Sequence, residues 1–377
     1  MIYLFNMVAC FDRLLSVLLL EDPPDRIPFY DLFADLEVVE ALTGRRLSEV
    51  KSLTIDRVKS IAAKGCENKL KPDYETIVRF YYTLGYDYIP LTLPSPFPRF
   101  NVKPCRDTAA LSRGLRVWQD ESRGTIESRE DFDKYDWPSE SDVQDSYMVL
   151  YRVVKEILPE GMMIIPLTPG GILENVMWLM GTIPFSKALY TDQTLVRDMF
   201  NKIGRIISFI CRLMSEQPMV GAISMGDDMG YKSGPMISPK HLRYYVFPWH
   251  KVCVDEVHRF GKPFILHSCG RLDIVIEDLI EYVGIDAKHS YEDFSYPVTR
   301  YKKLYGDRIA ILGGVDMDKL SRMPLEDFKT YVRSIIDECA PGGGYAIGCG
   351  NTVANYIKIE NYLAMLEVAR SYGRYPL

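Results

Sequence analysis

The chain has 377 residues, of which 47% are hydrophobic, and carries a formal net charge of −6 at pH 7. A chain of this size buries a large core, and an acidic balance without a basic block argues against nucleic acid as the main partner. Its eight cysteines are scattered without a close-spaced framework, which favours reduced thiols and a cytoplasmic location.

The apolar run at residues 14–20 is the one stretch that could be taken for a membrane or export segment. It is far shorter than the roughly 20 apolar residues of a membrane span. Asp12 and Arg13 precede it, and no small-residue cleavage site follows. The run therefore predicts a packed amphipathic helix, and we expect no association with a membrane.

Eight short runs of strand type alternate with helical segments along the chain. The predicted strands are residues 26–30, 86–91, 162–167, 220–224, 264–266, 285–289, 309–312 and 343–348. The predicted helices include residues 36–42, 73–84, 141–158, 173–180, 193–216, 238–260 and 359–372. This alternation of apolar strands and helices predicts an α/β fold, a single (β/α)8 TIM-type barrel over residues 1–377. An open doubly wound sheet is the second choice, because no Gly-x-Gly-x-x-Gly motif follows the first strand.

Residues 92–140 interrupt the alternation after the second strand. Prolines at positions 94, 96, 98 and 104 indicate an irregular loop, and residues 114–120 and 124–128 have the composition of two hairpin strands. The sequence therefore predicts an inserted hairpin or loop segment that covers part of the barrel mouth.

Polar side chains follow the predicted strands at their carboxyl ends, where barrel enzymes place their chemistry. On an extended segment, His267 and Cys269 point to the same side, so one ion can contact both. Together with Cys349, after the last strand, they offer three ligands for Zn²⁺ and leave a fourth position for substrate or water. The alternative is a buried histidine bonded to a neighbouring carbonyl group, with two inert core cysteines.

Further candidate site residues lie at the same end of the predicted barrel. The catalytic candidates are Asp227, Asp228 and Tyr30, and the substrate-binding candidates are Asn351, Asp316 and His289. Adjacent acids on a loop point apart, so at most one of the two aspartates faces the mouth, as a base or substrate-orienting group. Helix capping is the alternative for these aspartates and for Asp316, and a place in the wall is the alternative for His289.

Several motifs together resemble the uroporphyrinogen decarboxylase superfamily, whose members are (β/α)8 barrels. These motifs are Ser238-Pro239, His267-Ser268-Cys269-Gly270, Gly313-Gly314-Val315-Asp316, Glu360-Asn361-Tyr362-Leu363-Ala364-Met365 and Tyr372-Gly373-Arg374-Tyr375-Pro376, with a weaker match at Asp25-Arg26-Ile27-Pro28. The resemblance spans most of the chain outside the insertion.

Two chemistries compete within this superfamily. The decarboxylase branch carries an arginine-rich Met-Arg-Gln-Ala-Gly-Arg motif at its first strand, where this chain has Tyr30-Asp31-Leu32-Phe33-Ala34-Asp35. Asp31 and Asp35 would repel a tetrapyrrole with eight carboxylates. The aspartate that this branch places after its second strand is also missing from Pro90-Leu91-Thr92. We therefore expect no decarboxylation of uroporphyrinogen.

The other branch consists of zinc methyltransferases that move a methyl group between a corrinoid protein and a thiol such as coenzyme M. Their His-x-Cys…Cys motif is similar to His267, Cys269 and Cys349, so the resemblance implies Zn²⁺ at these residues and a corrinoid (cobalamin) carried by a partner protein. The expected activity is methyl transfer between that corrinoid and a thiol or a methylated small molecule, with the partner docked over the mouth. A lyase acting on another carboxylated substrate and a non-catalytic ligand-binding barrel are the alternatives, and a homodimer is left open.

Overall fold

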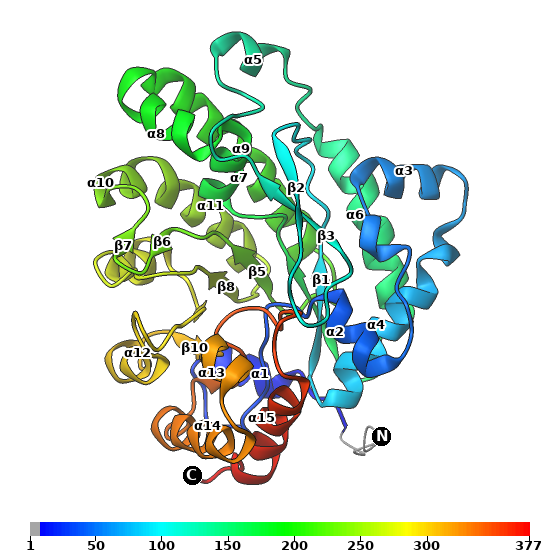
Figure 1. Ribbon diagram of the computed structural model, residues 1–377, viewed down its shortest axis with the longest axis vertical. Coiled ribbons are helices and arrows are strands. Elements are labelled where there is room, and N and C mark those ends of the chain that lie inside the picture. Colours follow the sequence, from blue (N-terminus) through cyan, green and yellow to red (C-terminus); the bar gives the residue numbers. More distant parts are fainter. Residues whose placement is uncertain (1–7) are drawn as a thin grey trace.

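A computed structural model describes residues 8–377, which form one parallel sheet surrounded by helices (Figure 1). The sheet has seven strands in the order β1 (Tyr88–Thr92), β4 (Met163–Leu167), β5 (Ile223–Gly226), β8 (Phe264–His267), β9 (Ala287–His289), β10 (Ala310–Leu312) and β11 (Tyr345–Ala346). All neighbouring pairs are parallel, and most strand residues are buried because helices cover the outer face and side chains fill the interior. The order follows the chain, as in a β/α barrel.

The helices follow the predicted alternation closely. They are α1 (Asp12–Leu18), α2 (Leu36–Thr43), α3 (Ile55–Ala63), α4 (Lys71–Leu84), α5 (Arg129–Lys134), α6 (Glu140–Lys155), α7 (Ile172–Met180), α8 (Thr182–Thr191), α9 (Gln193–Ser215), α10 (Pro239–His241), α11 (Phe247–His258), α12 (Val298–Tyr305), α13 (Met317–Arg322), α14 (Leu325–Cys339) and α15 (Ile359–Tyr372). Short 3₁₀ turns lie at Val50–Ser52 and Glu67–Lys69, and π-helical turns lie at Leu242–Val246 and Asp278–Val283. The predicted helix 238–260 is thus one α-turn, one π-helical stretch and α11.

The predicted first strand, residues 26–30, does not form a ladder in the sheet. Phe29 makes a single parallel bridge with Ile347, through bonds from Tyr30 N–H to the Ile347 carbonyl at 2.9 Å and from Ile347 N–H to the Pro28 carbonyl at 3.0 Å. Pro28 has no N–H, so the pairing cannot extend further toward the amino terminus. On the other side the Tyr30 ring stacks on Tyr88 of β1 at 5.6 Å. The sheet therefore curls until its two edges flank the same segment, but a closed eight-strand ladder is not confirmed.

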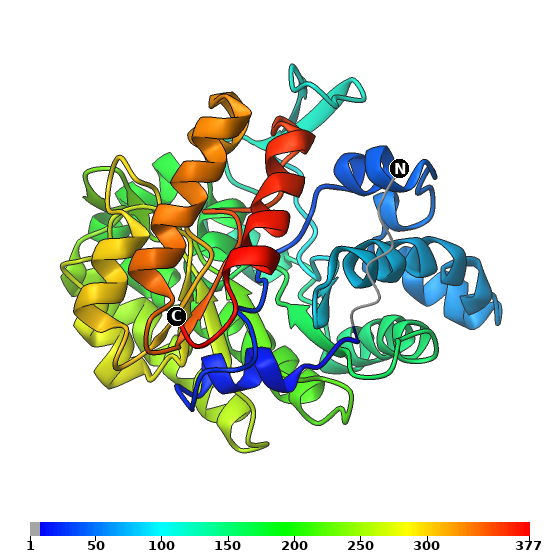
Figure 2. The ribbon, with the colours of Figure 1, turned by 90° about the horizontal axis from the view of Figure 1, so that it is seen from below.

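The insertion contains a two-stranded antiparallel hairpin, β2 (Val102–Arg106) and β3 (Leu115–Gln119). The predicted pairing of 114–120 with 124–128 is wrong, because Thr125 and Ile126 instead donate their N–H groups to the Leu179 carbonyl at 2.7 and 2.9 Å. Pro104 is tolerated in β2 because a two-stranded ribbon leaves one edge of each strand without a partner. The hairpin lies over the sheet in Figure 1 and projects at the end opposite α1 in Figure 2.

The first helix, α1, packs at the amino-terminal ends of the strands. Leu14, Val17 and Leu18 are buried, which confirms the predicted packed amphipathic helix. Phe11 precedes it and donates its N–H to the Gly161 carbonyl at 2.9 Å, just before β4. None of the helices in residues 8–377 is both long and apolar enough to cross a bilayer. The candidate site residues lie at the opposite end of the sheet, at the carboxyl-terminal ends of the strands.

Candidate metal centre

The local structure after β8 places Cys269 beside the loop that follows β5. The strand ends at His267, and Gly270 adopts a φ of +79°, in the left-handed region that favours glycine. A Cβ atom on Gly270 would lie 2.2 Å from the carbonyl group of Gly230. Only glycine therefore lets these two loops approach so closely.

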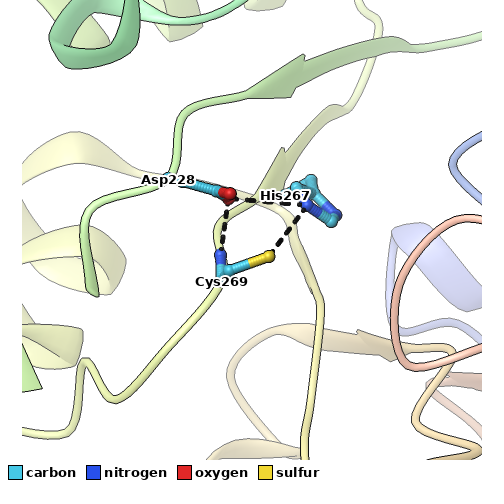
Figure 3. A group of neighbouring side chains, drawn as sticks. All are labelled: Asp228, His267 and Cys269. Atoms are coloured by element: carbon cyan, nitrogen blue, oxygen red, sulfur yellow. Dashed lines mark hydrogen bonds and ion pairs between the residues drawn. The ribbon is translucent and has the colours of Figure 1, made fainter. Parts of the chain in front are cut away.

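Asp228, His267 and Cys269 form a compact group of potential metal ligands at this point (Figure 3). One ligand atom from each lies within 4.8 Å of the other two. His267 Nε2 is 3.5 Å from Cys269 Sγ and 3.6 Å from Asp228 Oδ1. The backbone N–H of Cys269 donates to Asp228 Oδ1 at 2.8 Å, which holds the carboxylate beside the sulfur. One sulfur, one nitrogen and one oxygen atom thus converge on one place.

The spacing of these atoms suits a single zinc ion. Bonds of about 2.3 Å to sulfur and about 2.0–2.2 Å to nitrogen and oxygen place tetrahedral ligand atoms about 3.4–3.6 Å apart. The two distances measured from His267 Nε2, 3.5 and 3.6 Å, are of this size. Thiolate and imidazole ligands also favour zinc over magnesium or calcium. The residues present therefore fit the ion that the sequence predicted.

Two polar side chains contact the Cys269 sulfur. The Asn351 amide donates to Sγ at 3.1 Å, and the Ser290 hydroxyl donates at 3.5 Å. Ser290 has a φ of +82°, an uncommon conformation for a residue with a side chain, so the surrounding structure holds it there. Burial, followed by the charge of Asp228, raises the pKa of the Cys269 thiol. Without a metal the thiol is protonated at neutral pH, and both donors would stabilise the thiolate.

Lys288 is an ammonium group buried behind this site, with 1% of its surface exposed. Its Nζ donates to the carbonyl groups of Ser290 at 2.8 Å, His289 at 3.3 Å and Ser268 at 3.4 Å. These bonds join the ends of β8 and β9. Burial lowers the pKa of Lys288 to about 8.

His289 lies behind His267 in the wall rather than in the open mouth. Their Nδ1 atoms are 2.7 Å apart, and His289 Nε2 is 3.1 Å from the Cys349 carbonyl oxygen. Burial lowers the pKa of His267 to about 3 and the pKa of His289 well below its usual value. Both rings are therefore neutral, and His267 can offer a lone pair to a metal.

Cys349 is not part of the metal group. Its thiol lies against the Asp31 carboxylate, and its N–H donates to Asp31 Oδ1 at 2.7 Å. Burial, followed by the charge of Asp31, raises the pKa of this thiol well above its usual value. The structure therefore brings Asp228 together with His267 and Cys269, where the sequence predicted Cys349. The role of Cys349 as a ligand stays a prediction.

Comparison with known proteins identifies the family. The model of the uroporphyrinogen decarboxylase (URO-D) family matches residues 121–372. The chain belongs to this family. No curated protein matches it.

Among solved structures, this URO-D family member resembles a methyltransferase from Methanosarcina mazei, with a TM-score of 0.67 and 15% identity over 96% of this chain and 98% of that one. A putative vitamin-B12 independent methionine synthase from Listeria monocytogenes has a TM-score of 0.47 at 12% identity, covering 97% and 98% of the two chains. A β-glycosidase from Thermosphaera aggregans has a TM-score of 0.45 at 14% identity, covering 94% and 98%. At these identities the likeness shows the fold alone, and the first supports the barrel-like architecture.

Asp227 and Asp316 act as helix caps in this URO-D protein. The Asp227 carboxylate accepts from the N–H groups of Ile172, Leu173 and Glu174 at 2.9, 3.0 and 2.9 Å and contacts His250 Nε2 at 2.7 Å. Asp316 Oδ1 accepts from Asp318 N–H at 2.9 Å and Lys319 N–H at 3.1 Å, at the start of α13. Both side chains thus cap helices, which was the alternative interpretation. The predicted catalytic role of Asp227 and the predicted substrate-binding role of Asp316 are not supported by these contacts.

Tyr30 and the first-strand loop also differ from their predicted roles. The Tyr30 hydroxyl is 3.0 Å from Ser224 Oγ, and only 1% of the residue is exposed, so it forms part of the barrel interior. Asp31 is fully buried and accepts from the Tyr86 hydroxyl, and Asp35 accepts from Arg116 of the hairpin at 2.7 Å. Asp31 is shielded from solvent by burial and Asp35 is paired with a cation, so the predicted repulsion of a polycarboxylate is not supported.

Three residues near the site were not singled out by the sequence analysis. Lys288 had a readable signal, since it is a charged residue inside a predicted barrel strand. Ser290 had none, because its contact with Cys269 depends on an unusual backbone conformation. Glu174 lies beside the loop after β5, and burial followed by the charge of Asp228 raises its pKa well above the usual value. Glu174 had no signal in the sequence, because its proximity to Asp228 depends on the pairing of β4 with β5.

Proposed function

We propose that this URO-D family member is a zinc-dependent methyltransferase that moves a methyl group between a corrinoid carried by a partner protein and a thiol or methylated small molecule. The observation that carries the proposal is the Asp228–His267–Cys269 group at the carboxyl ends of β5 and β8. Three protein ligands, drawn from cysteine, histidine and carboxylate side chains, with a fourth position open are typical of a catalytic zinc site. The structural likeness to a methyltransferase supports the architecture that such chemistry would use.

The residues of the chain have separable roles in this proposal. Zinc, when bound, would hold a substrate thiol as the thiolate, which is the nucleophilic form. His267, the last residue of β8, and Cys269, two residues beyond it, would supply two of its ligands, and Asp228 would supply the third from the loop after β5. Asn351 donates to the Cys269 sulfur, which stabilises the thiolate form of this ligand. The corrinoid would supply the methyl group: the substrate's thiolate lone pair would form the new C–S bond, and the electron pair of the broken Co–C bond would stay with the corrinoid.

We further propose that residues 28–30 take the place of the eighth barrel strand. Their backbone bonds to Ile347, directly after β11, on one side, and Tyr30 stacks on Tyr88 of β1 on the other. This would make residues 8–377 one barrel domain around a single mouth. A corrinoid protein would reach that mouth next to the hairpin, where Leu115 and Val117 are 73% and 65% exposed.

The direct test mixes the zinc-loaded protein with methylcobalamin and 2-mercaptoethanesulfonate, the thiol coenzyme M, and follows the visible spectrum of the corrinoid. We expect the wild type to consume methylcobalamin and to form the methyl thioether, and Cys269→Ala to do neither. Cys105→Ala is the matched control, because it removes an exposed thiol on the hairpin and should keep full activity. Equal rates in the wild type and Cys269→Ala would contradict the proposal.

Assays of the zinc-loaded protein also test the two alternative functions, a lyase and a non-catalytic binding protein. A lyase would release carbon dioxide from a carboxylated substrate such as uroporphyrinogen, for which we expect no turnover because the arginine-rich motif is missing. A binding protein without catalysis would retain zinc and bind methylcobalamin without demethylating it.

A further inference from the structure

The hydrogen atoms of the two buried histidines can be placed from their partners. His289 Nε2 lies 3.1 Å from the carbonyl oxygen of Cys349, and a carbonyl oxygen can only accept. The hydrogen of the His289 ring is therefore on Nε2. A neutral imidazole has only one N–H, so His289 Nδ1 carries a lone pair.

The lone pair on His289 Nδ1 determines which nitrogen of the His267 ring carries the hydrogen atom. His267 Nδ1 lies 2.7 Å from His289 Nδ1, a distance that requires a hydrogen atom between the two nitrogens. Because His289 Nδ1 has none to give, His267 Nδ1 donates. The neutral His267 ring then has a bare Nε2, which is the atom 3.5 Å from Cys269 Sγ and 3.6 Å from Asp228 Oδ1.

The hydrogen bonds that run from Cys349 through His289 to His267 start at a peptide group that is itself held in place. Cys349 N–H donates to Asp31 Oδ1 at 2.7 Å, and Asp31 is fully buried and bonded to Tyr86. The N–H of Gly350 donates to the Val315 carbonyl at 2.7 Å, so the next peptide is held as well. The Cys349 carbonyl therefore cannot turn away from His289 without breaking bonds on both sides.

We propose that His289, held by the Cys349 carbonyl, is a positioning residue that fixes His267 as the Nδ1–H tautomer with Nε2 free to bind a metal. The inference deepens the proposed function, since it assumes that the group at Asp228 holds a metal ion. It also gives the loop after β11 a role through its backbone rather than through the Cys349 thiol. Partners of this kind orient metal-binding histidines, and their loss typically lowers metal affinity 10- to 100-fold.

The tautomers can be measured in the metal-free protein by long-range ¹⁵N–¹H correlation spectra of ¹⁵N-histidine-labelled samples. The chain has only five histidines, so each ring can be assigned by single substitution. We expect His267 to be protonated on Nδ1 and His289 on Nε2. Finding His267 protonated on Nε2 would overturn the inference, whether or not the protein binds zinc.

Zinc affinity, measured by competition with a chromophoric chelator, gives the second readout. His289→Phe keeps a ring of similar size but cannot accept from His267, and its zinc dissociation constant should rise 10- to 100-fold. His289→Gln can donate to Cys349 and accept from His267 through its amide, and its dissociation constant should stay within about threefold of the wild type. Equal affinity of His289→Phe and the wild type would refute the positioning role. A wild type that binds no zinc would refute the proposed function, while the tautomer spectra would still decide this inference.

Discussion

Asp227 and Asp228 are neighbours in the chain, but their carboxylates bind different elements. Asp227 accepts from three N–H groups at the start of α7 and contacts His250, whereas Asp228 accepts from the Cys269 N–H beside the metal group. Consecutive side chains of an extended segment point in opposite directions, which explains the division. One residue connects the loop after β5 to a helix, and the other connects it to the site.

Replacing each of these aspartates by alanine should separate stability from metal binding. Asp227→Ala leaves three helix N–H groups and His250 without their partner, so the free energy of unfolding should fall by about 2–4 kcal/mol. Asp228→Ala should change the free energy of unfolding by less than about 1 kcal/mol, because this carboxylate is partly exposed, but should weaken zinc binding at least tenfold. Urea denaturation with a chelator present and zinc competition measure the two quantities. The same loss of stability in both variants would contradict the assignment.

Serine substitutions at the two mouth cysteines test which thiol is a ligand. We expect Cys269→Ser to lose zinc, since serine does not ionise in place of a thiolate. Cys349→Ser should keep zinc, because the Cys349 thiol lies against Asp31 and outside the group. Zinc content after dialysis and the visible spectrum of the cobalt-substituted protein report on this. Loss of zinc in Cys349→Ser would restore Cys349 as the third ligand.

Zinc binding should release a proton from Cys269. Burial and Asp228 raise the pKa of this thiol, so it is protonated at neutral pH, whereas the metal binds the thiolate. His267, with its pKa lowered to about 3, has no proton to lose. Zinc affinity should therefore rise about tenfold for each unit of pH near neutrality, one proton per ion bound. Calorimetry in buffers of different ionisation enthalpy counts the protons, and a pH-independent affinity would contradict the prediction.

His258 should make stability depend on pH at the other end of the barrel. Its hydrogen bond to Asp286, at 2.7 Å, raises the pKa of His258 above the usual 6.5. The stabilisation is therefore fully present below pH 6.5 and is lost as pH rises through the folded-state pKa. Because the His258 side chain is 40% exposed, the effect should not exceed about 0.5 kcal/mol. NMR titration of the ring measures the pKa, and His258→Asn should remove this part of the pH dependence of unfolding.

The elements were predictable where local signals decide them. Residues 359–372 were predicted as a helix and form α15 with the same bounds, and Gly44 ends α2 in the left-handed conformation expected of a terminating glycine. The order of the parallel strands followed from alternating apolar runs and helices. His267 and Cys269 could be placed together because they are two residues apart at the end of one strand, with His267 its last residue.

The remaining features depend on contacts between distant parts of the chain. The Cys349 thiol turns to Asp31, a partner 318 residues away, and nothing near Cys349 in the sequence signals this. The partner of β3 was missed because Pro104 was taken as a sign of irregular loop. The charge of the first-strand loop was misjudged because Arg116, which pairs with Asp35, comes from the insertion.

The hairpin and the metal group are mechanically linked through the last loop. The Asn355 side-chain amide donates to Asp107 at 2.7 Å, and the Asn355 backbone carbonyl accepts from Leu111 N–H at 3.1 Å; both partners lie in the turn that connects β2 to β3. Four residues earlier in the same loop, Asn351 bonds to the Cys269 sulfur. A displacement of the hairpin would therefore be transmitted through this loop to Asn351, the residue that contacts the Cys269 sulfur. A partner protein bound to the hairpin would thus act on the metal group.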